Sequence, residues 1–173
     1  MAASNRGKQS VRNMFLSLVV IVAVAGVMYL FIPHDEKKDP VKRVDYRVEL
    51  LTAQRAAPYP VLAPQGLSDE WKATSVTYSR QDDNTWHLGY IEPDGEYIGV
   101  EQSTAPAEKY IAQVTHRAEK TERTQKVGDQ VWERWEGEKY DALVRREKGA
   151  TTVVTGTAPF ERLAEMAAAL KAK

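Results

Sequence analysis

Three histidines and a few serines are the side chains of this chain that could bind a metal ion or act in acid–base or nucleophilic catalysis. The histidines are His34, His87 and His116, and no two have the i, i+4 spacing that places two zinc ligands on one face of a helix. The chain has no cysteine, which excludes thiolate metal sites, thiol catalysis and disulfides. We therefore expect no metal site and interpret each histidine as an exposed or edge residue.

The serines lack the local pattern of an activated nucleophile. Four of them are expected in loops or at strand ends, and none stands in a G-x-S-x-G elbow: Ser68, Ser75, Ser79 and Ser103. The segment GTAPFER, residues 156–162, lacks the lysine and hydroxyl residue of a phosphate loop. The acidic pair Asp82-Asp83 falls in an expected turn, where acids are common. The sequence thus predicts no enzyme and no cofactor; the alternative is a hydrolase assembled from Ser, Asp and His side chains distant in sequence.

The four tryptophans are the remaining candidates for a functional surface: Trp71, Trp86, Trp132 and Trp135. Trp132 and Trp135 are three positions apart on an expected strand, so their side chains should point to opposite faces of a sheet. We expect one to face the core and the other to face solvent or a helix on the far side. Because aromatic side chains often line apolar grooves, these residues are the predicted surface for an apolar ligand or a protein partner.

The clearest element among those that must position these side chains is a β-hairpin. Two runs of alternating apolar and polar residues are joined by Pro-Asp-Gly at 93–95, a typical turn sequence. The alternation places Trp86 and Leu88 on one face of the hairpin and His87 and Gly89 on the other.

The rest of the C-terminal domain, residues 45–173, alternates between strands and helices. Further strands are expected over about 71–80, 130–136, 140–148 and 151–156, and an extended piece over 59–63. Helices are expected over about 106–118, capped by Thr104, and over 159–170; residues 45–57 favour a helix, although their first part also alternates like a strand. The polar chain up to Lys126 is expected to be a connection. This order predicts an α+β fold, with one antiparallel sheet and helices packed on it.

A different kind of segment precedes this domain. The 19 residues from Met14 to Ile32 carry no charge, and as a helix they would extend ~28 Å, close to the thickness of a bilayer core. They predict one N-terminal transmembrane helix in contact with membrane lipid, between a cytoplasmic tail (1–13) and a charged linker (33–44). A signal peptide cleaved after Ala25 is the alternative, but six more apolar residues follow Gly26, which favours an uncleaved anchor.

The orientation of this anchor is predicted from the charges beside it. Residues 1–13 carry three basic residues and no acid, whereas the segment after the anchor balances basic and acidic residues. A count of Lys and Arg alone does not favour either orientation of the anchor. We expect the short basic flank in the cytoplasm and the domain 45–173 outside the cytoplasm, at the cell membrane. Reversed topology, with the domain facing the cytosol, is the alternative.

Charge also limits the partners of the domain. The chain has 24 basic and 24 acidic residues, but residues 1–45 carry an excess of positive charge and the remainder an excess of negative charge. DNA- and RNA-binding domains typically present a basic face. We therefore expect no nucleic-acid partner.

Several stretches together resemble a known family. They are APYPVLAPQGL, WHLGYIEPDGEYIGVEQS, VGDQVWERW, ALVRR and TTVVTGTAPFERLAEMAAAL. In this order they resemble domain-of-unknown-function family 4245, actinobacterial proteins with one N-terminal anchor and one small extracytoplasmic domain. The resemblance implies no activity and transfers no site residue. The order of strands and helices is also similar to that of PsbP-like domains, which implies a binding or accessory module.

Overall fold

The computed structural model describes the backbone of residues 5–31 and 41–172 and the side chains of residues 13–28 and 41–172. The chain divides into two compact units, Met1–Pro40 and Val41–Lys173, and each is described by itself. The predicted charged linker lies largely outside the described residues, as does the end of the predicted membrane span.

The N-terminal unit contains one helix, α1 (Asn5–Phe31). Its large apolar side chains, from Met14 to Met28, are exposed. Within the residues that the structure describes, no helix is both long and apolar enough to cross a membrane.

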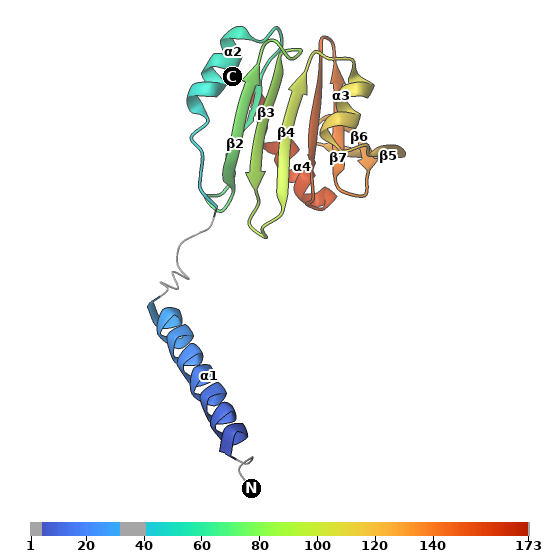
Figure 1. Ribbon diagram of the computed structural model, residues 1–173. Coiled ribbons are helices and arrows are strands. Elements are labelled where there is room, and N and C mark those ends of the chain that lie inside the picture. The colour runs from blue at the N-terminus through green and yellow to red at the C-terminus, as the bar shows by residue number, and fades with distance from the viewer. Residues whose placement is uncertain (1–4, 32–40, 173) are drawn as a thin grey trace. The chain divides into compact units, whose positions relative to one another are not determined.

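The second unit is built on a seven-stranded sheet, as the sequence predicted for the α+β class (Figure 1). Its strands are β2 (Lys72–Ser79), β3 (Thr85–Ile91), β4 (Tyr97–Ser103), β5 (Glu119–Val127), β6 (Gln130–Glu136), β7 (Asp141–Glu147) and β8 (Ala150–Gly156). Their order is β2-β3-β4-β8-β7-β6-β5, and every pair is antiparallel. The sequence did not predict a second sheet, which pairs β1 (Leu62–Pro64) with β9 (Leu170–Ala172).

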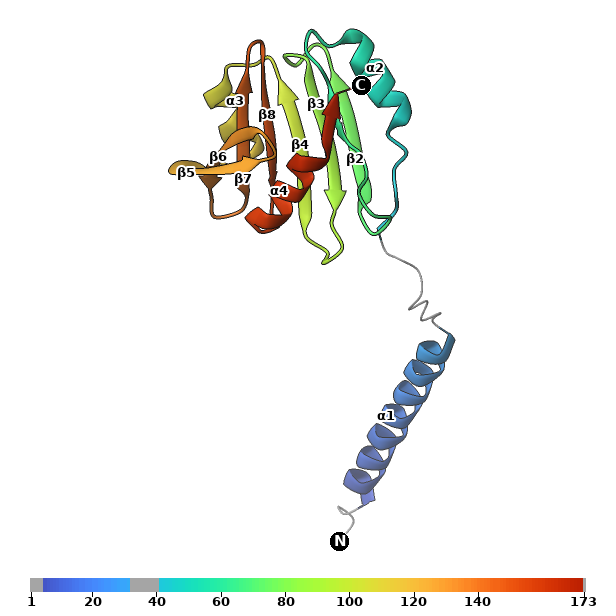
Figure 2. The same cartoon turned by 180° about the vertical axis from the view of Figure 1, so that it is seen from behind.

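One face of the large sheet, here named the α4 face, is covered by helix α4 (Phe160–Ala169), by helix α2 (Arg47–Ala56) and by the small sheet (Figure 2). Alternate residues of the strands point into this layer because side chains alternate along a strand. The largest apolar cluster forms there, with Trp86 and Leu88 of β3 packed together with Leu163 and Met166 of α4. All four are fully buried.

The opposite face, here named the α3 face, is covered by helix α3 (Ala107–Val114) over one half only. Tyr110 and Ile111 pack on Val144 and Val153 of β7 and β8, and with Trp135 they form a separate cluster. Among the described elements, none crosses β2 and β3 on this face (Figure 1). Polar side chains of β2 and β3 are therefore partly open to solvent there.

Two expectations about local structure were wrong. The polar chain expected to be a connection contains strand β5, which pairs only with β6 at the edge of the sheet. Most of its side chains are exposed, so it lacks the apolar alternation that marks a half-buried strand. Thr104 does not cap α3: its hydroxyl donates to the carbonyl oxygen of Asp83, and the helix begins after Pro106 without a side-chain cap.

Candidate functional site

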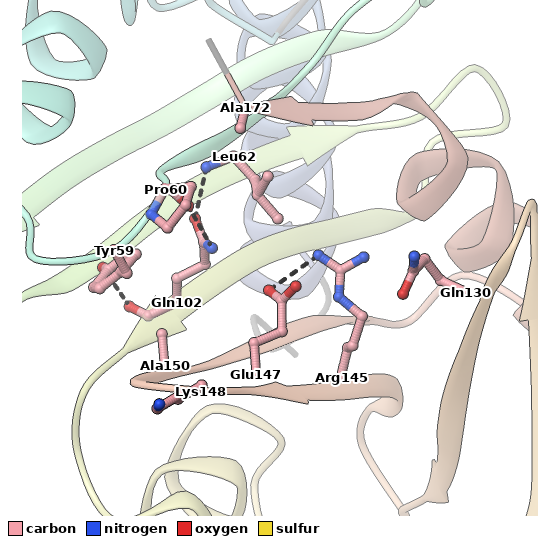
Figure 3. Close-up of a pocket in the computed structure, with 10 residues that line it drawn as sticks. All are labelled: Tyr59, Pro60, Leu62, Gln102, Gln130, Arg145, Glu147, Lys148, Ala150 and Ala172. Atoms are coloured by element: carbon pink, nitrogen blue, oxygen red, sulfur yellow. Dashed lines mark hydrogen bonds and ion pairs between the residues drawn. The ribbon is translucent and has the colours of Figure 1, made fainter.

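A cleft of about 440 Å³ lies on the α4 face between the small sheet and strands β4, β6, β7 and β8. Figure 3 shows the residues that line it: Tyr59, Pro60, Leu62, Gln102, Gln130, Arg145, Glu147, Lys148, Ala150 and Ala172. Strand alternation places Arg145 on this face and its neighbour Arg146 on the α3 face, where Arg146 forms an ion pair with Glu108 of α3. The cleft therefore receives one guanidinium from β7.

The guanidinium of Arg145 is held mostly out of solvent. It lies over the ring of Trp132, 4.8 Å from the ring centroid, and its side chain is only 18% exposed. One terminal nitrogen, Nη2, donates to Glu147 Oε2 at 3.1 Å. The Nε atom is buried and has no hydrogen-bond partner among the described residues. An unpaired buried donor is destabilising by ~1–3 kcal/mol, which makes the guanidinium of Arg145 a candidate for binding an acceptor.

The opposite wall of the cleft is fixed by Gln102. Its side-chain carbonyl accepts from the backbone N–H of Leu62 at 2.7 Å, and its Nε2 donates to Pro60 O and Thr152 Oγ1. Tyr59 donates to the backbone carbonyl of Gln102 at 3.2 Å. Burial raises the pKa of Tyr59, so its hydroxyl remains a donor. These bonds join the segment before β1 to the sheet and keep the cleft open beside it.

A second cavity, of about 320 Å³, adjoins the first. Arg145 and Gln130 line both cavities, and the second is also lined by Trp132, Leu170 and Lys171. Arg145 thus faces two spaces at once, with an aromatic ring beneath it. A flat or apolar group can lie against such a surface while an anionic group meets the guanidinium.

The α3 face holds a different polar arrangement, a row of three side chains from adjacent strands. Ser75 Oγ lies 2.8 Å from His87 Nε2, and His87 Nδ1 lies 2.6 Å from Glu101 Oε1. His87 and Glu101 are register partners across β3 and β4. A bulge in β2 between Ala73 and Ser75 reverses the alternation there, so that Ser75 faces outward beside His87.

The charge of His87 is governed by this row. Burial opposes protonation of the imidazole, but the hydrogen bond and the negative charge of Glu101 outweigh it and raise the pKa of His87. The side chain of Glu101 is only 9% exposed, and Tyr110 of α3 donates to its second oxygen at 3.5 Å. The carboxylate is therefore fixed from two sides.

The row corrects two expectations from the sequence. Ser75 lies inside β2 rather than in a loop or at a strand end. His87 is half-buried on an inner strand and bonded on both ring nitrogens, rather than an exposed or edge residue. The hairpin alternation could have paired His87 with Glu101, but the bulge that brings Ser75 to them leaves no clear signal in the sequence.

The comparison with known families identifies the family of this chain. The model of DUF4245, a family of proteins of unknown function, matches residues 6–170. The chain belongs to the DUF4245 family. No curated protein and no solved structure matches it. The resemblance to PsbP-like domains therefore stays a prediction.

In this DUF4245 chain the four predicted tryptophans are all buried, three of them in the main cluster on the α4 face and one in the cluster under α3. Trp132 lies under Arg145, and Trp71 lines a third cavity, of about 300 Å³, with Tyr46 and Tyr90. Trp86 donates from Nε1 to Leu62 O at 3.1 Å inside the core. Trp135 packs in the cluster under α3, which confirms that it and Trp132 point to opposite faces. A ligand surface formed by these tryptophans stays a prediction.

Metal ligands are not gathered in the domain. No group of three or more His, Asp or Glu side chains within the described ranges, 13–28 and 41–172, is placed to hold a metal ion. Of the other histidines, His116 follows α3 with a left-handed backbone and lies against the ring of Tyr140, whereas His34 falls outside the described residues.

Proposed function

We propose that this DUF4245 chain is a membrane-anchored binding protein whose C-terminal domain takes up a small anionic ligand in the cleft at Arg145. The observation that carries the proposal is the mostly buried guanidinium whose Nε atom lacks an acceptor at the junction of two cavities. A cleft of about 440 Å³ is within the range of ligand sites, ~300–1,000 Å³.

The chemistry of the lining selects the ligand class. Arginine offers five N–H donors in a planar fork that matches a carboxylate or a phosphate, and few of the donors of Arg145 have partners. Leu62, Ala150 and Ala172 supply apolar wall beside it. Glu147 offsets part of the charge of the arginine, so a ligand would have to contact the guanidinium beside this ion pair. We therefore propose a ligand that combines one anionic group with a flat or apolar part.

Calorimetric titration of the full chain in uncharged detergent tests this proposal, with phenyl phosphate and benzoate as probes and phenol as the uncharged reference. We expect the anions to bind and phenol to bind much more weakly. Arg145→Gln should weaken binding of the anions by about 10-fold or more, because hydrogen bonds to charged groups contribute ~1.5–3 kcal/mol. Arg146→Gln is the matched control, since that side chain lies on the other face. Equal binding by the two variants would contradict the proposal.

The anchor is the second part of the proposal. The uncharged run from Met14 to Ile32 supports it, and so do the exposed apolar side chains of α1. These side chains are exposed within the N-terminal unit, and a lipid environment would bury them. The protein should remain in the membrane pellet through alkaline carbonate and should enter detergent at full mass. Release by carbonate, or a mature N-terminus at Gly26, would overturn the anchor.

The location of the domain outside the cytoplasm rests on the basic N-terminal flank. Arg6, Lys8 and Arg12 precede the anchor without an acid among them. Protease added to intact spheroplasts should digest residues 45–173. Protection of this domain would support the reversed topology, with the domain facing the cytosol.

A further inference from the structure

We propose that Ser75, His87 and Glu101 form a nucleophilic centre on the α3 face that hydrolyses carboxylic esters. This goes beyond binding in the Arg145 cleft, because the row lies on the other side of the sheet and shares no residue with that cleft. The proposal also opposes the expectation from the sequence that the domain catalyses nothing.

The order of the three groups is that of a serine–histidine–acid relay. A carboxylate can only accept, so the 2.6 Å contact requires a proton on His87 Nδ1. In neutral His87 the lone pair is then on Nε2, 2.8 Å from Ser75 Oγ, where it can take the hydroxyl proton. Glu101 is a positioning residue, because it acts through His87.

Two facing glycines give the row its space. Gly89 and Gly99 are register partners on β3 and β4. A Cβ atom on Gly89 would lie 2.4 Å from Ser75 Oγ and 3.1 Å from the Tyr97 hydroxyl, and one on Gly99 would lie 3.0 Å from that hydroxyl. The two hydroxyls therefore flank the same spot on the sheet, and a side chain at position 89 would displace them.

The Tyr97 hydroxyl is a donor near this spot that can serve a developing oxyanion. Strand β3 is paired on both sides, so its backbone N–H groups are used within the sheet. Burial and the charge of Glu101 raise the pKa of Tyr97, which keeps its hydroxyl protonated and able to donate. A donor aimed at the position where negative charge develops is a large contribution to catalysis.

The reaction balances with water as the only co-reactant. Ser75 Oγ attacks the ester carbonyl carbon while His87 Nε2 takes its proton, and the carbonyl oxygen becomes the oxyanion. The bond from carbon to the alcohol oxygen breaks, and the alcohol leaves with the proton from His87. Water then attacks the acyl-serine with His87 as base, which releases the acid and restores Ser75. The groups that face His87 throughout are Ser75 of β2 and Glu101 of β4.

The experiment uses the full chain in detergent with two probes, a biotinylated fluorophosphonate and p-nitrophenyl acetate. We expect mass spectrometry to place the fluorophosphonate on Ser75 and absorbance to show ester turnover. Ser75→Ala should abolish both, and His87→Gln should lower both by about 100-fold or more. Ser79→Ala, on the same strand but bonded to the turn at Asp82, is the matched control and should behave as wild type.

Two further variants separate chemistry from structure. Circular dichroism melting of every variant confirms that it is folded, and Ser75→Cys should restore acylation by p-nitrophenyl acetate. Glu101→Gln should lower the rate and move the rise of the pH–rate profile to lower pH, because the carboxylate that raises the pKa of His87 is gone. Folded protein with no label on Ser75, or with labelling unchanged in His87→Gln, would overturn the proposal.

Discussion

The two faces of the seven-stranded sheet carry polar groups of different kinds because they are covered to different extents. On the α4 face, helices and the small sheet form a second layer, and polar groups such as Arg145 and Gln102 lie between the layers beside a cleft. On the α3 face, helix α3 covers β7 and β8, and the row at His87 stays within reach of solvent.

This difference decides what each polar group can do. A guanidinium between two layers has lost most of its water, and Arg145 keeps one buried nitrogen without an acceptor. A serine and a histidine on a half-open face keep access to water and to bulky reactants. The same strand alternation thus yields a binding cleft on one side and a row of reactive groups on the other.

The largest expected effect is on stability, and it tests whether β6 is packed into a hydrophobic core on both of its faces. Trp132 and Trp135 are buried on opposite faces, so replacing either with Ala should lower the free energy of unfolding by ~3–5 kcal/mol. Val131 on the same strand is 60% exposed, and Val131→Ala should change stability by less than ~0.5 kcal/mol. Denaturant unfolding measures all three. A tryptophan whose loss is as mild as that of Val131 would belong to a surface, as the sequence-based hypothesis holds.

A slightly smaller loss of stability is expected for the second layer, and it tests whether α4 is docked on the sheet. Leu163 of α4 is fully buried in the main cluster, so Leu163→Ala should lower the free energy of unfolding by ~2–5 kcal/mol. Exposed Glu161 on the same helix provides the control, Glu161→Ala. If urea unfolding showed a loss below ~0.5 kcal/mol for Leu163→Ala, α4 would not be docked and the Arg145 cleft would lack its layer.

A third prediction concerns crowding on the α3 face. Gly89→Ala would place a Cβ atom 2.4 Å from Ser75 Oγ, and overpacking of this kind lowers the free energy of unfolding by ~1–3 kcal/mol. The double variant Gly89→Ala/Ser75→Gly removes the clashing hydroxyl and should recover much of the loss. Thermal melts of the two variants check this. Equal melting temperatures would show that the two residues are not in contact.

The smallest effect expected is the pH dependence from His87. Its pKa is raised in the folded state, so the stability that it contributes is fully present below the pKa of the unfolded chain, ~6.5. That contribution is lost as the pH rises through the higher folded value. Unfolding free energies of wild type and His87→Gln, measured between about pH 5.5 and 8.5, should therefore converge as the pH rises. A constant difference would show that Glu101 does not stabilise the imidazolium.

The fold was largely predictable from the sequence because most elements carry local signals. The Pro-Asp-Gly turn fixed the hairpin β3–β4, and apolar spacing marked α2, α3 and α4. Strand β5 was missed because it is polar on both faces. An extended piece was expected where β1 lies, but its pairing with the short strand β9 was missed because the two are distant in sequence.

The candidate sites were much less predictable, since they depend on contacts between distant segments. The clefts at Arg145 form only when β9, at the end of the chain, pairs with β1. Ser75 joins His87 only because a bulge shifts β2 by one residue. Neither the pairing of β1 with β9 nor the bulge in β2 has a recognisable residue pattern. The pairing of His87 with Glu101, by contrast, follows from the Pro-Asp-Gly turn of the hairpin.

Strand β5 has a consequence for how copies of this protein meet each other. Its outer edge leaves backbone donors and acceptors unpaired, and such an edge is a template for a strand from another molecule. Charged, exposed side chains line it, among them Glu119, Lys120, Glu122, Arg123 and Lys126. Charged side chains along an edge strand are a common way in which proteins discourage pairing with another copy. The charged edge at β5 therefore opposes the addition of strands from other copies, and with it the growth of larger aggregates.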